Sequence, residues 1–374
     1  MSGGVYGLRV TGSATTAFVL DVPVAAFVVG MVLLLGIALG VLLALRERHW
    51  RRPPPTVIAA EPEDRPLPAV VAHPLRTAGD ARARITRQCV ELGWREPLWL
   101  ETTAEDPGTG QANTAVRRGA DVVMACGGDG TIRSVAQALA GTGVAMALLP
   151  TGTGNLLART LGSPMELLPA VRTALTGDDR KVDVGWVRVD GAEDERAFLV
   201  MAGTGFDATI MEATPEALKV RVGTLAYVIS GLRAMRGRRT RVTLTLDDGA
   251  PLRRRTRTVL VGNSGTLLGG LVLMPAAAVD DGLLDVVNIA PKGLAGWVAV
   301  LVRVLTRRRR GHQRIEHWQA RSIVIAADAP QPSQLDGDPI GEAAELRIRV
   351  EQGALVVRVP DAVPPDPPPI TNPR

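Results

Sequence analysis

The chain has 374 residues, of which 46% are hydrophobic and 22% charged, which is the composition of a globular protein long enough for two domains. The formal net charge of +5 at pH 7 favours an anionic partner, but no basic run is interleaved with aromatic residues, so we expect no nucleic-acid partner. The two cysteines stand far apart in the sequence and form no CxxC pair, which excludes a disulfide framework.

Residues 24–45 form the uncharged run VAAFVVGMVLLLGIALGVLLAL. A helix of this length spans about 33 Å, which matches the hydrocarbon core of a bilayer at about 30 Å. Basic residues follow the run at 46–52. The positive-inside rule therefore places residues 1–23 outside the cytoplasm and the rest of the chain within it. A cleaved signal peptide would carry its charge before a shorter run. We predict a single-pass protein of the cell membrane with a cytoplasmic catalytic body.

A basic, proline-rich linker is predicted over residues 46–66, and a proline-rich, disordered tail over residues 360–374. Between them, residues 67–182 alternate between strand and helix patterns. Strands are expected at 67–73, 98–103, 121–125 and 144–149, with helices at 80–92 and 131–140 and one ending at 113–118. Such alternation favours a parallel, doubly wound α/β sheet, in which ligands bind at the carboxyl ends of the strands.

Residues 183–359 are rich in β-type runs, for example TRVTLTLDDG and RRRTRTVLVGN, and predict a mostly antiparallel second domain. Helical insertions are plausible at 217–235 and 294–310. The second insertion ends in arginines after an apolar stretch. It fits a helix lying on an anionic leaflet, and it equally fits a helix packed on the domain with a solvated basic end.

Two glycine-rich loops follow neighbouring strands of the first domain, GGDGT at 127–131 and PTGTGN at 150–155. Glycines let successive backbone N–H groups approach an anion closely, and the helix that follows adds the positive end of its dipole. Asp129 would repel a free phosphate, so a magnesium–nucleotide suits the first loop better. Neither loop is a Walker P-loop or a GxGxxG fingerprint. Taken alone, GGDG is as well explained by a plain turn.

The motifs GGDGT, PTGTGNLLAR, VDVG, AGTGFDA, DDGLLD and LDGD follow one another in this order between residues 127 and 338. In this order they resemble the diacylglycerol kinase family, which includes sphingosine kinases and bacterial lipid kinases. The resemblance covers about residues 67–360. It implies an α/β ATP-binding domain of the NAD kinase and diacylglycerol kinase type, a C-terminal antiparallel β-sandwich that receives the lipid, and an active site in the cleft between them.

The resemblance also implies roles for individual residues. ATP contacts would come from Thr103, Gly127, Gly128, Asp129, Gly130, Thr131, Ile132, Arg133, Gly152 and Thr153. A structural Mg²⁺ would be held by the Asp281 carboxylate with the carbonyl oxygens of Ala278 and Leu283. The family's Asp-Gly-Glu motif stands here as Asp336-Gly337-Asp338, which makes Asp336 and Asp338 the candidate catalytic pair.

Three positions depart from the family pattern: His73 replaces the usual asparagine of the first loop, Val200 replaces another asparagine, and Asp338 replaces the glutamate. The expected function is a membrane-anchored kinase that transfers the γ-phosphate of ATP to a lipid hydroxyl, with diacylglycerol to phosphatidic acid as the favoured reaction. An NAD kinase-like enzyme and a non-catalytic lipid- or nucleotide-binding member are the alternatives. A homodimer is compatible with the sequence, but nothing in the sequence supports one.

Overall fold

The computed structural model describes residues 64–77, 79–205, 239–265, 274–290 and 315–360. Contacts divide the chain into a unit of residues 1–61 and a unit of residues 62–374, and the described residues lie in the second unit. The predicted membrane helix at 24–45, the tail from 361 and the two helical insertions lie outside the described residues. Within those residues, no helix is both long and apolar enough to cross a membrane.

The first domain is built on four parallel strands in the order β2-β1-β3-β4, as the alternating pattern predicts. Its strands are β1 (Pro68–Ala72), β2 (Leu98–Glu101), β3 (Val122–Gly127) and β4 (Ala145–Pro150). Its helices are η1 (Pro74–Arg76), α2 (Ala81–Glu91), α3 (Thr109–Arg117), α4 (Asp129–Leu139), α5 (Leu156–Thr160) and α6 (Leu167–Thr176).

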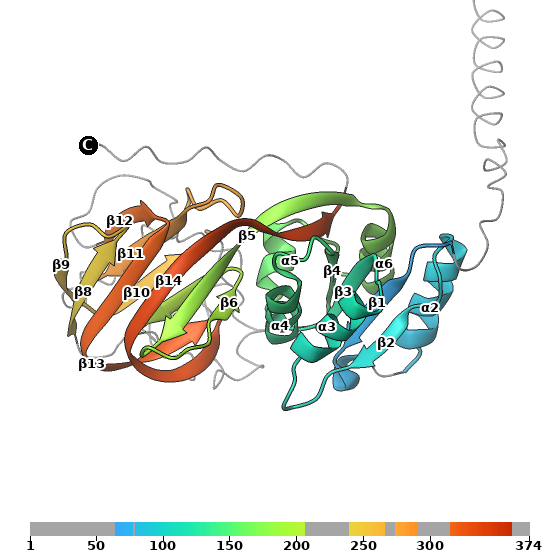
Figure 1. Ribbon diagram of the computed structural model, residues 1–374, viewed down its shortest axis with the longest axis horizontal. Helices are drawn as coiled ribbons and strands as arrows, with labels where there is room; N and C mark the ends of the chain where they lie inside the picture. The colour runs from blue at the N-terminus through green and yellow to red at the C-terminus, as the bar shows by residue number, and fades with distance from the viewer. Residues whose placement is uncertain (1–63, 78, 206–238, 266–273, 291–314, 361–374) are drawn as a thin grey trace, which may run out of the picture. The chain divides into compact units, whose positions relative to one another are not determined.

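Helices cover both faces of this sheet, so the doubly wound prediction is confirmed (Figure 1). Alternate residues of β1 face opposite sides: Val71 packs with residues of α3 and α4, and Val70 packs with residues of α2 and α6. Val122 to Cys126 on β3 are fully buried, as a central parallel strand requires.

The second domain is antiparallel, also as expected. Its strands are β5 (Asp178–Val189), β6 (Arg196–Phe198), β7 (Met201–Thr204), β8 (Thr240–Leu246), β9 (Leu252–Thr256), β10 (Thr258–Gly262), β11 (Leu284–Ile289), β12 (Ile315–Ala320), β13 (Ser322–Leu335) and β14 (Asp338–Val359). The first part of β13 pairs with β8, and its last residues pair with β7 after a register shift between Ala326 and Gln331. Strand β13 therefore takes part in both layers of a β-sandwich, which enclose an aliphatic core.

Two long strands, β5 and β14, belong to both domains. They pair with each other along most of their length, and Val357 near the end of β14 pairs in parallel with Met146 of β4. Val182 on β5 and Leu355 on β14 are buried in the core of the first domain. The sheet is therefore continuous from one domain into the other, which holds the glycine loops and the β13–β14 turn in one framework.

Candidate active site

The two glycine loops touch at the carboxyl ends of β3 and β4. The Thr151 N–H donates to the Gly127 carbonyl at 3.0 Å. A Cβ placed on Gly152 would lie only 2.6 Å from the Gly128 Cα, so a side chain there would force the loops apart. A Cβ on Gly127 would lie 2.5 Å from the Thr131 Cβ. The lack of a side chain at Gly127 and at Gly152 is thus a packing requirement.

Helix α4 begins directly at the first loop, with Gly128 as an extended N-cap that carries no capping side chain. The helix starts at Asp129, two residues earlier than the sequence pattern suggests. Its first-turn N–H groups have no acceptor within the helix, and they stand at the positive end of the helix dipole. This is a ready anion-binding site beside the second glycine loop.

The Asp129 carboxylate ties the two loops together. It accepts hydrogen bonds from the backbone N–H groups of Asn155, at 2.8 Å, and Leu156, at 2.6 Å, at the start of α5. Asn155 adopts a left-handed backbone, φ 49°, and its side chain exchanges two hydrogen bonds with Gly152. Burial raises the pKa of Asp129, the two backbone hydrogen bonds oppose that rise, and the nearby Asp338 carboxylate adds to it.

Asp338 stands over the N-terminus of α4. A Cβ on Gly130 would lie 3.2 Å from Asp338 Oδ2, so the carboxylate is in contact range of the first turn. Arg133, one turn along α4, forms an ion pair with Asp338 at 2.8 Å and donates to the Leu335 carbonyl at 2.6 Å. The Asp338 side chain is 44% exposed, so it remains accessible from solvent.

Asp336 has a different environment from its predicted partner. Its side chain is buried and accepts hydrogen bonds from the backbone N–H groups of Leu199, Val200 and Met201 at 2.8 to 3.3 Å. Burial raises the pKa of Asp336, while the Arg133 charge and these hydrogen bonds lower it. Asp336 is 5% exposed, far less than Asp338. Both stay candidates from the sequence, and we expect Asp338 to be the one that a substrate hydroxyl reaches and Asp336 to fix the turn that carries it.

The predicted metal residues lie apart, at the turn before β11. Asp281 Oδ1 accepts from the Leu283 N–H at 2.9 Å, whereas Oδ2 is buried and has no hydrogen-bond partner in the described part of the chain. Burial raises the pKa of Asp281 to about 6, and the neighbouring carboxylates of Asp285, Asp183 and Asp280 add to the rise. Within the described ranges, no group of three or more His, Cys, Asp or Glu side chains could hold a metal ion. The predicted set of one carboxylate and two carbonyl oxygens does not need such a group, and the orphaned Asp281 oxygen suits a hard cation.

Of the remaining residues predicted to contact ATP, two are exposed and one is buried. Thr103 and Thr153 are exposed, and each lies beyond the carboxyl end of its strand. Ile132 is 1% exposed and packs in the core of the first domain, so its side chain faces away from the loops. Two buried polar atoms near the loops, His73 Nδ1 and Thr151 Oγ1, have no hydrogen-bond partner among the residues that the structure describes. Both residues directly follow a strand end, where ligands bind in sheets of this type.

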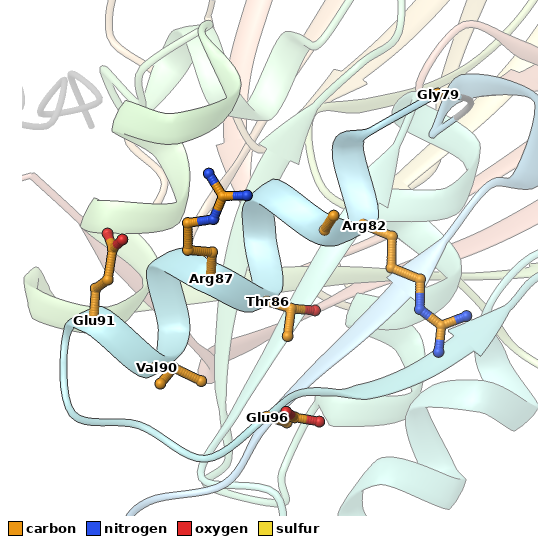
Figure 2. Close-up of a pocket in the computed structure, with 8 residues that line it drawn as sticks. Gly79, Arg82, Thr86, Arg87, Val90, Glu91 and Glu96 are labelled. Atoms are coloured by element: carbon orange, nitrogen blue, oxygen red, sulfur yellow. The ribbon is translucent and has the colours of Figure 1, made fainter.

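A separate open groove of about 630 Å³ lies along the outer side of α2 (Figure 2). Gly79, Arg82, Thr86 and Val90 are among the residues that line it. None of the predicted site residues borders this groove, and we assign no function to it.

Comparison with known proteins gives matches over both domains. Residues 76–187 match the model of the diacylglycerol kinase catalytic domain, and residues 200–359 match that of the YegS C-terminal NAD kinase beta sandwich-like domain. A probable lipid kinase YegS-like of Pseudomonas aeruginosa is 35% identical over 304 residues, which cover 77% of this chain and 93% of the relative. A probable lipid kinase YegS of Salmonella gallinarum is 34% identical over 260 residues, 67% of this chain and 82% of the relative.

Among solved structures, a putative diacylglycerol kinase from Bacillus anthracis shares the fold with a TM-score of 0.62. It is 22% identical and covers 79% of this chain and 97% of its own. The family models and these relatives together show a two-domain, ATP-dependent kinase. More narrowly, the chain belongs to the diacylglycerol kinase family, with a second domain of the YegS type.

Proposed function

We propose that this protein transfers the γ-phosphate of ATP to the hydroxyl of a membrane lipid, with diacylglycerol as the substrate and phosphatidic acid as the product. The observation that carries the proposal is the position of Asp338, a solvent-accessible carboxylate held against the N-terminus of α4. A hydroxyl that reaches this carboxylate is also next to the anion site where the nucleotide phosphates would bind. The curated relatives are named probable lipid kinases, which supports a lipid as the acceptor.

In this mechanism Asp338 orients the lipid hydroxyl and accepts its proton as the oxygen attacks the γ-phosphorus. The bond from that phosphorus to the bridging oxygen breaks, and ADP leaves. The N–H groups of α4 and the two glycine loops hold the phosphates, and Arg133 fixes the direction of Asp338. Positioning and charge neutralisation supply most of the rate enhancement in such transfers.

Magnesium enters the proposal at two places. With ATP it would offset the like charges of Asp129 and Asp338, which lie close enough for one to raise the pKa of the other. A structural ion would be held by Asp281 with the carbonyl oxygens of Ala278 and Leu283, where it would satisfy the orphaned Asp281 oxygen.

A membrane anchor at residues 24–45 is part of the proposal. Diacylglycerol remains in the bilayer, so a kinase tethered there keeps its cytoplasmic site close to the substrate. The length and charge asymmetry of the apolar run support the anchor.

The test is transfer of labelled phosphate from ATP to diacylglycerol in mixed micelles by the full chain. Asp338→Asn removes the proton acceptor and should lower kcat by about 100-fold or more. Glu342→Gln is the matched control, because Glu342 is an exposed acid farther along the same strand. Label in another lipid would keep the mechanism and change the substrate. Formation of NADP from NAD would favour the NAD kinase-like alternative, and ATP binding without transfer to any acceptor would favour the non-catalytic one.

A further inference from the structure

The β8–β9 hairpin of the second domain presents arginines on its outer face. Along β9, Arg254 turns inward and pairs with Glu316 of β12 at 2.8 Å, whereas Arg253 and Arg255 are exposed. Arg241 on β8 is also exposed and stands directly opposite Arg255 in the strand register. We call Arg241, Arg253 and Arg255 the arginine surface.

The arginine surface lacks the counter-charges found elsewhere on the same sheet. On β14 of the same sheet, Arg347 pairs with Glu345 at 2.6 Å and Arg349 pairs with Glu195 at 2.7 Å. The three guanidinium groups of the arginine surface form no ion pair or hydrogen bond with any residue that the structure describes. Like charges directly opposite each other on paired strands destabilise a sheet. An external anionic partner would offset that cost.

A further arginine, Arg239, lies at the same end of the domain. Arg239 donates to the Ala290 carbonyl at 2.6 Å, which places the start of β8 beside the end of β11. β11 pairs with β12, so the start of β12 lies there too (Figure 1). In the sequence, basic residues precede both strands, as RGRR at 236–239 and RRRRGHQR at 307–314. Of these, Arg239 is described by the structure, and it lies at the start of β8, close in the chain to Arg241.

We propose that the arginine surface docks the second domain on an anionic membrane, through the phosphate groups of lipid head groups. This inference rests on the proposed function, because a kinase with a substrate in the bilayer has reason to hold its body there. Three exposed arginines on two adjacent strands can meet an extended charged plane at once. Each such residue near an anionic leaflet strengthens binding about fivefold, so the arginine surface favours the docked state by about 100-fold at low salt.

The experiment measures hydrogen exchange of the full chain in lipid nanodiscs. Discs of phosphatidylcholine alone are compared with discs that also contain phosphatidylglycerol. We expect slower exchange over β8 and β9 only with phosphatidylglycerol, and loss of that protection at about 0.5 M salt, where screening is short-ranged. The triple variant Arg241→Gln, Arg253→Gln, Arg255→Gln should abolish it. The control triple Arg95→Gln, Arg117→Gln, Arg118→Gln removes the same charge from exposed residues of the first domain and should retain it.

Equal exchange in the two kinds of disc would overturn the proposal, as would protection that survives in the arginine-surface variant. Protection by added double-stranded RNA, without protection by phosphatidylglycerol, would assign the surface to nucleic acid and also overturn it. Exchange is independent of turnover. A protein that transfers no phosphate but is still protected from exchange would therefore count against the kinase reaction alone. A protein that transfers phosphate but shows no protection would count against docking alone.

Discussion

Replacement of Arg133 by methionine tests whether α4 positions the candidate proton acceptor. The guanidinium joins α4 to the β13–β14 turn by its bonds to Asp338 and to the Leu335 carbonyl, and its side chain is 19% exposed. The bond to the carbonyl contributes about 1.5 kcal/mol or more, and the ion pair with the half-exposed Asp338 contributes under about 1 kcal/mol. We expect the free energy of unfolding to fall by about 2 kcal/mol.

The effect on catalysis should be larger than this loss of stability implies. Without Arg133, Asp338 loses its fixed direction over α4, and misplacement of a catalytic group by about 1 Å can cost about 100-fold in rate. We expect Arg133→Met to lower kcat by about 10- to 100-fold and to leave KM for ATP nearly unchanged. The kcat of Arg133→Lys should lie between those of the wild type and Arg133→Met, because one ammonium group cannot bind both Asp338 and the Leu335 carbonyl as the guanidinium does. Steady-state kinetics with urea unfolding measure both effects.

A double-mutant cycle makes the reasoning refutable. If Arg133 acts through Asp338, the variant Arg133→Met with Asp338→Asn should be no slower than Asp338→Asn alone. Full additivity of the two losses would show that the residues act independently. A raised KM for ATP with kcat intact would show that Arg133 contacts the nucleotide instead, as the family resemblance implies.

Three further outcomes follow from the same contacts. Asp336→Asn should lower the free energy of unfolding by about 2 kcal/mol, by urea titration, because an amide cannot accept all three N–H groups. Its kcat per folded molecule should fall by less than about tenfold, through the loosened turn that carries Asp338, whereas loss of a proton acceptor would cost about 100-fold or more. Asp281→Ala should abolish any rise in melting temperature caused by Mg²⁺. Asp280→Ala, which removes the adjacent acid that pairs with Arg180, should preserve the rise. Gly152→Ala should weaken ATP binding by about tenfold or more in calorimetry, because the new Cβ collides with Gly128; unchanged affinity would mean that the loops need not touch.

The sequence predicted the first domain well because its signals are local. Buried strands such as Val122–Gly127 are continuous apolar runs, and the glycines after them mark the strand ends. The course of β14 could not be predicted in this way. Its pairing of Val357 with Met146 joins residues far apart in the sequence, and no short sequence pattern shows which strand will lie beside which.

The same distinction holds for the site. The two glycine loops and the acids of the Asp-Gly-Asp turn can be found by reading the sequence, but their roles depend on contacts across the fold. Asp129 appears in the sequence as a cation ligand, yet its carboxylate caps a helix that starts 27 residues later. Arg133 and the Leu335 carbonyl that it binds are 202 residues apart. Only the folded chain shows that Asp336 is buried and that the Asp338 side chain is exposed.

The shorter acid at position 338 fits this site for a steric reason. Asp336 is bound by three N–H groups on one side of the turn, and Arg133 holds the Leu335 carbonyl on the other, so the turn cannot easily move away from α4. The Asp338 carboxylate already lies within contact range of Gly130. A longer side chain at this position would have to fold back against the first turn of the helix. With the turn fixed so close, we expect an aspartate to reach the first turn of α4 without the extra methylene of a glutamate, and Asp338→Glu to lower kcat and not to raise it.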